Sequence, residues 1–323
     1  MKILLALNDR EDAKIFAHRF ISAISGNNYN LKIAAYNKST IYGMPIDYNL
    51  ESLKYIYNAK FRSFTGTPLE TYYNQIKHFN PDIIISDMEL YTSHIAKLLN
   101  IKIWQVSPLL LHYSTPLAAK AQIGFFAQYQ YFFLLGFELS EIIRNCIYNA
   151  DKRFVYSHFG DANVFNIEKN FEWVRPYHNI GKVSLPCSHN IVSAVYHNDK
   201  KLINYMKQYK DGVLFSIFTD ENYYDISIKN IYDADEYFCN IKNSHFILSQ
   251  GYSSFLADAF YNEKHVLLLP NYMEHECTQN SLYSAYFGTG TICNEDMHLE
   301  SIAPKKVVYD NNIKFLHEHL ENL

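Results

Sequence analysis

The sequence predicts an α/β fold in which two doubly wound, Rossmann-like domains occupy one chain of 323 residues. The first observation is that short apolar segments alternate with helical patterns, as expected of parallel strands that helices cover on both faces. The second is that this alternation occurs twice, once in each half of the chain. Two such domains would face a central cleft between the carboxyl ends of their sheets, where open α/β folds bind ligands.

The first half of the chain contains the first series of strands and helices. A stretch at 122–139 is rich in aromatic residues, but three glutamines and a glutamate interrupt it. It therefore predicts a buried or cleft-lining helix and not a membrane span. Strands are expected at 2–7, 31–36, 82–87, 102–107 and 153–159, and helices at about 12–25, 68–79 and 91–100.

The second half repeats the pattern. We place a first Rossmann-like domain at 1–180, a second at 181–305, and a terminal helix at 306–323 that packs back on the first domain. Strands are expected at 212–218, 245–249 and 265–270, and helices at 198–210, near 232–242, after Gly251, at about 277–287 and at 311–323.

Composition indicates a globular protein without a strong overall charge. Apolar residues make up 48%, and 29 basic against 33 acidic residues give a net charge of -4, which neither demands nor excludes nucleic acid. Five widely spaced cysteines without a C-x-x-C pair favour a reducing, cytoplasmic location. The first apolar run has only five residues, too few for a signal-peptide core or a transmembrane segment.

Several enzyme classes lack their motifs in this sequence. There is no G-x-S-x-G, P-loop or G-x-G-x-x-G motif, which argues against a hydrolase, a kinase or a dinucleotide oxidoreductase. The fourteen histidines show no H-E-x-x-H spacing, and no metal site is expected.

The most informative stretch begins with "SQGYSSFLAD" at 249–258. Ser249 ends a predicted strand, Gly251 permits a tight turn, and Ser253 or Ser254 can cap the next helix. The amino end of that helix suits a phosphate, and Asp258, one turn further along the same face, would lie near the ribose hydroxyls of a nucleotide. An ordinary capped helix after a strand would show the same local pattern.

A second polar cluster follows the next predicted strand, in "LLLPNYMEHECTQN". It brings Glu274, Glu276, Gln279 and Asn280 to the same expected edge. Carboxylates and amides together can hold the vicinal hydroxyls of a sugar, because such hydroxyls need both acceptors and donors.

The whole stretch 249–280 resembles the donor signature of GT-B glycosyltransferases of the UDP-glycosyltransferase and MurG-like kind. "MKILLAL" and "NPDIIISDMELYTSHIAKLLNIKIWQVS" resemble the first strand and the Asp-bearing strand of that group's acceptor domain. The chain departs from the group at Tyr252, where a second glycine is usual, at His265, and at Cys277, where a glutamine is usual. The residues that the resemblance assigns to donor binding are Ser249, Gln250, Gly251, Tyr252, Ser253, Ser254, Asp258, Glu276, Cys277 and Asn280.

Within that set, the resemblance implies contacts from the serines and Gly251 to the diphosphate, from Asp258 to the ribose and from Glu276 to the transferred sugar. Glycosyl transfer also needs a base at the cleft. Asp9, just after the first strand, is our preferred candidate, followed by Asp12, although either could simply cap the helix that follows. Asp87, at the end of a later strand, could bind the acceptor, orient a neighbouring group or serve as a turn residue.

The sequence therefore predicts a glycosyltransferase that moves a sugar from a nucleotide-diphosphate sugar, most simply a UDP-sugar, to a hydroxyl acceptor. The acceptor could be a small molecule, a glycan or a modified DNA base. The resemblance implies an inverting, metal-independent reaction in which the nucleotide sugar is a co-substrate and no cofactor is needed. The alternatives are a phage-type DNA glycosyltransferase acting on a hydroxymethylated base, a non-catalytic nucleotide-sugar-binding protein, and a nucleotide-sugar epimerase.

Overall fold

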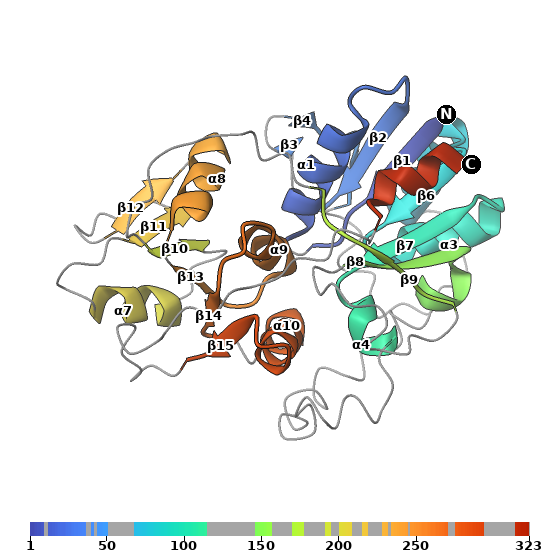
Figure 1. Ribbon diagram of the computed structural model, residues 1–323. Coiled ribbons are helices and arrows are strands. Elements are labelled where there is room, and N and C mark those ends of the chain that lie inside the picture. The colour runs from blue at the N-terminus through green and yellow to red at the C-terminus, as the bar shows by residue number, and fades with distance from the viewer. Residues whose placement is uncertain are drawn as a thin grey trace.

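Two parallel β-sheets, of seven and six strands, form the framework of the protein in a computed structural model. In Figure 1 the first sheet lies on the right and the second on the left. The structure describes residues 1–9, 12–36, 40–41, 44–50, 68–114, 146–156, 170–177, 191–194, 200–208, 215–218, 228–231, 234–244, 246–270, 275–293 and 314–322.

The first sheet has the strand order β5-β2-β1-β6-β7-β8-β9, and all its strands are parallel. The chain runs from β1 to one side of the sheet and returns to pair β6 with the other side of β1. The direction of winding therefore changes between β1 and β6, which makes this the switch point of the sheet. The strands are β1 (Lys2–Ala6), β2 (Asn30–Ala35), β5 (Tyr48–Asn49), β6 (Ile83–Ser86), β7 (Ile103–Ser107), β8 (Lys152–Tyr156) and β9 (Glu172–Val174).

Helices cover both faces of the first sheet because its strands are apolar on both sides. Leu5 packs with Phe16 and Phe20 of α1 on one face, whereas Leu4 packs with Tyr91 on the other. A short antiparallel pair, β3 (Thr40–Ile41) and β4 (Met44–Pro45), follows β2. The helices are α1 (Asp12–Ile24), α2 (Pro68–Phe79), α3 (Leu90–Leu99) and α4 (Leu110–Ser114).

The second sheet has the order β12-β11-β10-β13-β14-β15 and is also entirely parallel. Its switch point lies between β10 and β13, by the same reasoning. The strands are β10 (Ile191–Ala194), β11 (Phe215–Phe218), β12 (Ile228–Ile231), β13 (Phe246–Ser249), β14 (Val266–Leu268) and β15 (Gly290–Ile292). The helices are α7 (Lys200–Gln208), α8 (Ala234–Asn243), α9 (Ser253–Tyr261) and α10 (His275–Tyr286).

The carboxyl-terminal segment lies against the first sheet's domain, although it follows the second sheet in sequence (Figure 1). Leu316 and Leu320 of the 3-10 helix η4 (Leu316–Asn322) join the apolar core around α1, and Phe315 forms a β-bridge with Arg175. An α-helix was expected here. The expected domain boundaries at 180/181 and 305/306 fall outside the described residues.

Wherever the structure describes the chain, the strands and helices predicted from the sequence are present, except that the segment predicted as an α-helix at 311–323 forms the 3-10 helix η4. The predicted helix at 122–139 lies outside the described residues. The prediction missed the short strands β9, β10, β12 and β15, as well as β3 to β5. None of the helices in the described ranges is long and apolar enough to cross a membrane.

Candidate functional site

The candidate residues follow strands at the two switch points. In the first domain, Asp9 follows β1 and Asp87 follows β6, and these two strands are neighbours. In the second domain, the Gly251 turn follows β13, which pairs with β10. Loops at a switch point diverge to opposite faces of the sheet, and ligands bind in the crevice that they leave.

The turn after β13 requires a glycine. Gly251 has a φ of +109°, and a Cβ at this position would lie 2.5 Å from the carbonyl oxygen of Cys277 and 2.8 Å from Oγ of Ser281. The amide of Gly251 donates to Oγ of Ser249 at 3.0 Å. The turn is therefore packed directly on the backbone of α10, and the Ser249 hydroxyl supports the turn itself.

Helix α10 holds the turn from the other side. The Asn280 side-chain amide donates to the Gly251 carbonyl oxygen at 2.8 Å, and the Ser281 hydroxyl donates to that of Gln250 at 3.4 Å. The structure thus brings the Gly251 turn together with the described part of the second polar cluster, whereas Glu274 lies outside the described residues. Glu276 and Cys277 are also buried here, in the first turn and a half of α10.

Helix α9 begins directly after this turn, at Ser253. Tyr252 is its N-cap residue, with φ -66° and ψ 131°, and it provides no side-chain capping hydrogen bond in the described part of the chain. The first amides of a helix and its dipole attract an anion. The side chains of Ser253 and Ser254 lie outside what the structure describes, so only the backbone amides of this helix end can be described as donors.

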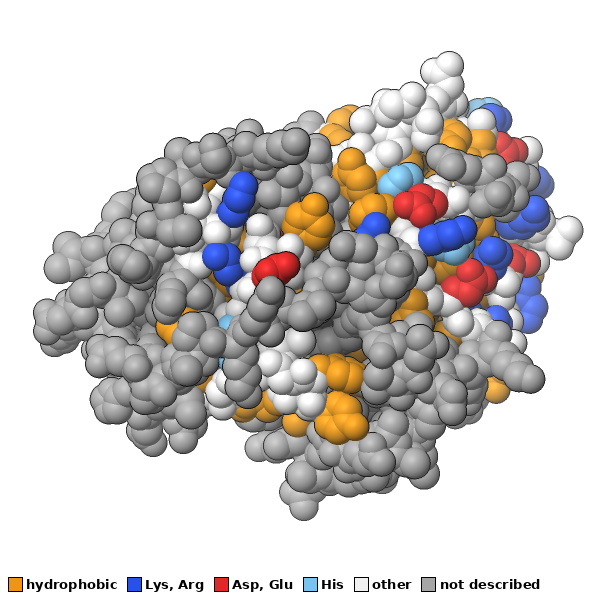
Figure 2. All heavy atoms as spheres, viewed as in Figure 1, with side chains coloured by type: hydrophobic (Ala, Val, Ile, Leu, Met, Phe, Trp, Pro, Cys, Tyr) orange, Lys and Arg blue, Asp and Glu red, His pale blue; other side chains and the backbone are white. Residues whose placement is uncertain are grey.

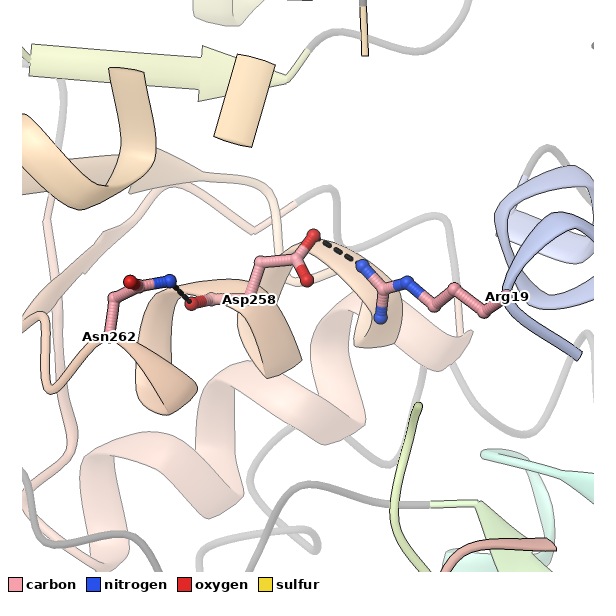
Figure 3. A network of polar contacts seen from close by, with 3 residues as sticks. All are labelled: Arg19, Asp258 and Asn262. Carbon is pink, nitrogen blue, oxygen red and sulfur yellow. Dashed lines mark hydrogen bonds and ion pairs between the residues drawn. The ribbon is translucent and has the colours of Figure 1, made fainter. Parts of the chain in front are cut away.

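Asp258 lies on α9 but its carboxylate is turned towards the first domain. Figure 3 shows Arg19 extending from α1 to this carboxylate, with which it forms a hydrogen-bonded ion pair. The two side chains are only 4% and 0% exposed, respectively. The backbone carbonyl of Asp258 also accepts a bond from the Asn262 side chain at 2.8 Å. In this structure the expected ribose ligand is therefore engaged with the other domain.

A second contact joins the domains at α10. The Gln279 side-chain amide donates to the carbonyl oxygen of Pro108 at 3.1 Å, and Pro108 directly follows β7 of the first sheet. Gln279 is fully buried. The carboxyl end of β7 and the start of α10 therefore meet across the domain interface.

The three candidate catalytic carboxylates, the possible bases Asp9 and Asp12 and the possible acceptor ligand Asp87, have different surroundings. Asp9 is exposed in the loop after β1, and its amide donates to Oδ1 of Asn8 at 2.6 Å. Asp12 is the first residue of α1, and its side chain is outside what the structure describes. Asp87 is 1% exposed, and its amide donates to the Ala6 carbonyl oxygen at 2.8 Å. Of the two that are described, only Asp9 has a solvent-accessible carboxylate.

Glu89 is a buried carboxylate that the sequence reading did not select. It caps α3 by accepting hydrogen bonds from the amides of Tyr91 and Thr92, and it also accepts from the Thr92 hydroxyl and from the Tyr36 hydroxyl at 2.7 Å. Burial and the nearby Glu89 charge raise the pKa of Tyr36 far above its ordinary value, and they raise that of Tyr91 to about 12. This network fixes the loop after β6, where Asp87 lies.

A neighbouring chain of polar contacts ties the same loop to β7. The Met88 amide donates to Oε1 of Gln105 at 3.1 Å, and Gln105 donates to the Ser93 hydroxyl at 2.6 Å. Met88 has a φ of +53°, an uncommon conformation for a non-glycine residue, which these bonds hold in place. The Ser93 hydroxyl also contacts the Cys146 thiol at 3.4 Å, and burial raises the pKa of that thiol to about 12. The Cys146 thiol is therefore protonated at neutral pH.

Neither a cluster of metal ligands nor a surface of one charge distinguishes the candidate site in the described part of the chain. Within the described ranges, no group of three or more His, Cys, Asp or Glu side chains is placed to hold a metal ion. Among the residues coloured in Figure 2, basic and acidic side chains are interspersed on the part of the surface formed by the first domain.

Comparison with solved structures identifies the architecture. The protein is similar over 92% of its length to 87% of the spinosyn forosaminyltransferase SpnP, with a TM-score of 0.59 at 12% identity. It is similar over 90% of its length to 86% of the spinosyn rhamnosyltransferase SpnG, with a TM-score of 0.60 at 10% identity. The chain has the GT-B fold.

The comparisons recognise the GT-B fold by structural similarity. The glycosyltransferase VinC in complex with DTDP gives a TM-score of 0.58 at 10% identity, over 92% of this chain and 88% of that one. No protein-family model matches the sequence, and the comparison with curated proteins gives no match either. At such identities the similarity establishes the fold, and the activity has to be argued from the site.

For three residues around the candidate site, the sequence analysis missed the residue or did not predict its contact. Arg19 interrupts the apolar stripe of α1 next to Phe20, and a charge in such a stripe signals a buried partner. Glu89 directly precedes an apolar helix, which is an N-cap position. Gln279 was grouped with the sugar-binding cluster, but no pattern in the sequence indicates its bond to Pro108.

Proposed function

We propose that this protein is a glycosyltransferase that moves a sugar from a nucleoside-diphosphate sugar to a hydroxyl group. The observation that carries the proposal is the amino end of α9, which follows the Gly251 turn at the switch point of the second sheet and has no side-chain cap from Tyr252. A diphosphate is the leaving group that such a positive helix end stabilises best, because negative charge builds up on it as the glycosidic bond breaks.

The donor nucleotide in this proposal is a pyrimidine diphosphate. The sequence resemblance favours uridine, whereas SpnG and VinC are structures complexed with thymidine diphosphate. The two nucleotides share the diphosphate and differ in the base and the ribose 2′ position. The fit of a diphosphate to the amino end of α9 supports a nucleoside-diphosphate donor. Measuring the binding of UDP and dTDP side by side decides which nucleotide the protein uses.

The acceptor in this proposal loses a proton to a carboxylate of the first domain. Asp9 is preferred over Asp87 because a base needs access to the acceptor, and Asp9 is exposed while Asp87 is buried. The acceptor oxygen bonds to the sugar carbon, the bond from that carbon to the diphosphate breaks, and the proton goes to the carboxylate. Attack opposite to the leaving group would invert the configuration, and the helix end would carry the diphosphate charge without a metal.

The acceptor class is open within this proposal. SpnG has been complexed with spinosyn aglycone, a precedent for a small-molecule acceptor in this fold. The DNA alternative gains no support from the interspersed charges in Figure 2. A DNA acceptor would be recognised by binding that weakens steeply as salt increases.

The test is thermal stabilisation by UDP, dTDP, GDP and CMP and by their sugar conjugates. A ligand that binds only the folded protein stabilises it, by about 2.7 kcal/mol at a hundred times its Kd. We expect UDP or dTDP to stabilise the wild type. Ser254→Asp places a negative charge in the first turn of α9, which should stabilise the unliganded helix by about 0.5 kcal/mol but remove the response to the diphosphate.

The matched control is Lys200→Glu, which adds an acid at the start of α7 in the same domain, where the first turn has none. It should retain the nucleotide response. If no nucleotide stabilises the wild type, or if Ser254→Asp responds like the wild type, the proposed donor site is wrong. Product analysis with the best donor then separates transfer from mere binding, and a changed sugar released without any acceptor would indicate an epimerase.

A further inference from the structure

We propose that Arg19 is a positioning residue. Through its ion pair with Asp258 it holds α9 against α1 and so fixes the donor helix relative to the loop that carries the candidate base. The pairing is observed in the structure, and its consequence for transfer rests on the function proposed above. Asp258 in this view is a contact between domains and not a ribose ligand.

The geometry places this pair between the two candidate sites. Asp12 begins α1 directly after the loop of Asp9, and Arg19 lies about two turns further along that helix. Asp258 lies about one and a half turns from the amino end of α9. Each helix is short and rigid, so joining them at this point sets the distance between the loop after β1 and the anion site.

The first domain holds Arg19 firmly in place. Phe16 and Phe20, on either side of Arg19 along α1, are buried in the core with Leu316 and Leu320 of η4. Figure 3 shows the arginine side chain crossing from α1 to α9, where Asn262 fixes the backbone at Asp258. The pair therefore links two helices, one in each domain.

Burial makes the pair sensitive to the loss of either partner. With both side chains almost fully buried, removing one charge takes the ion-pair partner away from a charge that has little access to water. The remaining charge regains water if the domains separate. The Gln279 bond to Pro108 spans the same interface, and we expect it to be lost when the domains separate.

The experiment measures domain separation directly. Small-angle X-ray scattering is recorded for the wild type, Arg19→Met, Asp258→Asn and the double variant Arg19→Met/Asp258→Leu, each without ligand. We expect a larger radius of gyration for both single variants and a return towards the wild-type value for the double variant, because no unpaired charge remains. Lys152→Met, which breaks the exposed ion pair with Glu172 inside the first sheet, is the control and should leave the radius unchanged.

A nucleotide titration of the same variants separates the proposal from its rival. If the pair only positions the domains, both single variants keep the affinity of the wild type for UDP or dTDP within about twofold, because the proposed site lies within the second domain. If Asp258→Asn alone loses nucleotide affinity and the radius does not change, Asp258 is a nucleotide ligand and the positioning role is wrong. An unchanged radius in both single variants also overturns it. The scattering result needs no ligand, so it stands even if the wild type binds no nucleotide.

Discussion

At the scale of single residues, Glu89 shows how one buried carboxylate can organise a loop. It is 2% exposed and accepts hydrogen bonds from two amides at the start of α3 and from two hydroxyls. An ionised carboxylate tolerates such burial because charge-assisted bonds replace those it makes to water. The loop after β6, including Asp87, therefore has one defined conformation next to β1.

Replacing Glu89 by alanine should destabilise the protein by about 3 kcal/mol, because several buried donors lose their acceptor and α3 loses its cap. Chemical denaturation measures this loss. The matched control is Glu70→Ala, at a half-buried acid in the first turn of α2, which should cost about 0.5 kcal/mol. Equal losses from the two variants would mean that the network around Glu89 contributes little.

The sequence identified most of the residues that gather at the second switch point, but it did not indicate where their side chains point. The spacing of Gly251 and Asn280 predicted that both lie at one edge, and a hydrogen bond joins them. The direction of Asp258 could not be predicted, because its partner Arg19 is 239 residues away in the chain. Local sequence patterns predict helix caps and turns, whereas contacts between domains can be identified only in the folded structure.

At the scale of elements, three half-buried histidines lie on three helical segments of the first domain: His18 on α1, His94 on α3 and His319 on η4. Burial lowers the pKa of each, with a further contribution from nearby cations: Arg19 at His18, Lys97 at His94 and Lys152 at His319. At His319 the Glu172 carboxylate opposes this effect, but burial is the larger cause. These helical segments therefore favour neutral histidines.

The stability of the protein should fall as the pH decreases from 7 to 5. With pKa values lowered in the folded state, the unfolded chain takes up protons first as the pH passes below about 6.5, so the stabilisation is complete above that pH and is lost towards the lowered values. Unfolding free energies at several pH values measure the slope. His94→Gln should make it shallower, with the same change at exposed His78 as a control for the substitution. A slope that His94→Gln leaves unchanged would contradict this account.

The prediction of helices and strands was correct where the sequence pattern was long, and it missed elements whose pattern was short. Helix α2 begins and ends at the predicted residues, because twelve residues carry several repeats of the helical period. Strand β10 was missed although it lies in the middle of the second sheet, since four residues, Ile191 to Ala194, show no distinctive alternation. Its position comes from pairing with β11 and β13, which is information outside the strand itself.

At the scale of the whole molecule, the doubled strand and helix pattern was sufficient to predict two parallel sheets, whereas the GT-B fold was predicted from the resemblance of residues 249–280 to GT-B donor sites. The relation between the two domains was not predictable, because it depends on a few contacts between distant residues. Two of these are the Arg19 pair with Asp258 and the Gln279 bond to Pro108. They join different helices of the second domain to different elements of the first. If the two domains closed or opened as rigid bodies, both contacts would therefore form together or be lost together.

A double-mutant cycle tests whether these two contacts form as a unit. Arg19→Met should cost about 3 kcal/mol, since it removes the cation that faces the buried Asp258 carboxylate, and Gln279→Ala about 1 kcal/mol for one lost hydrogen bond. If the domains separate when the ion pair is lost, the Pro108 contact is already absent, and the double variant should cost little more than Arg19→Met alone. Denaturant unfolding of the three variants and the wild type gives the coupling energy. Additive losses would show that each contact forms independently of the other and that the interface does not close as a single body.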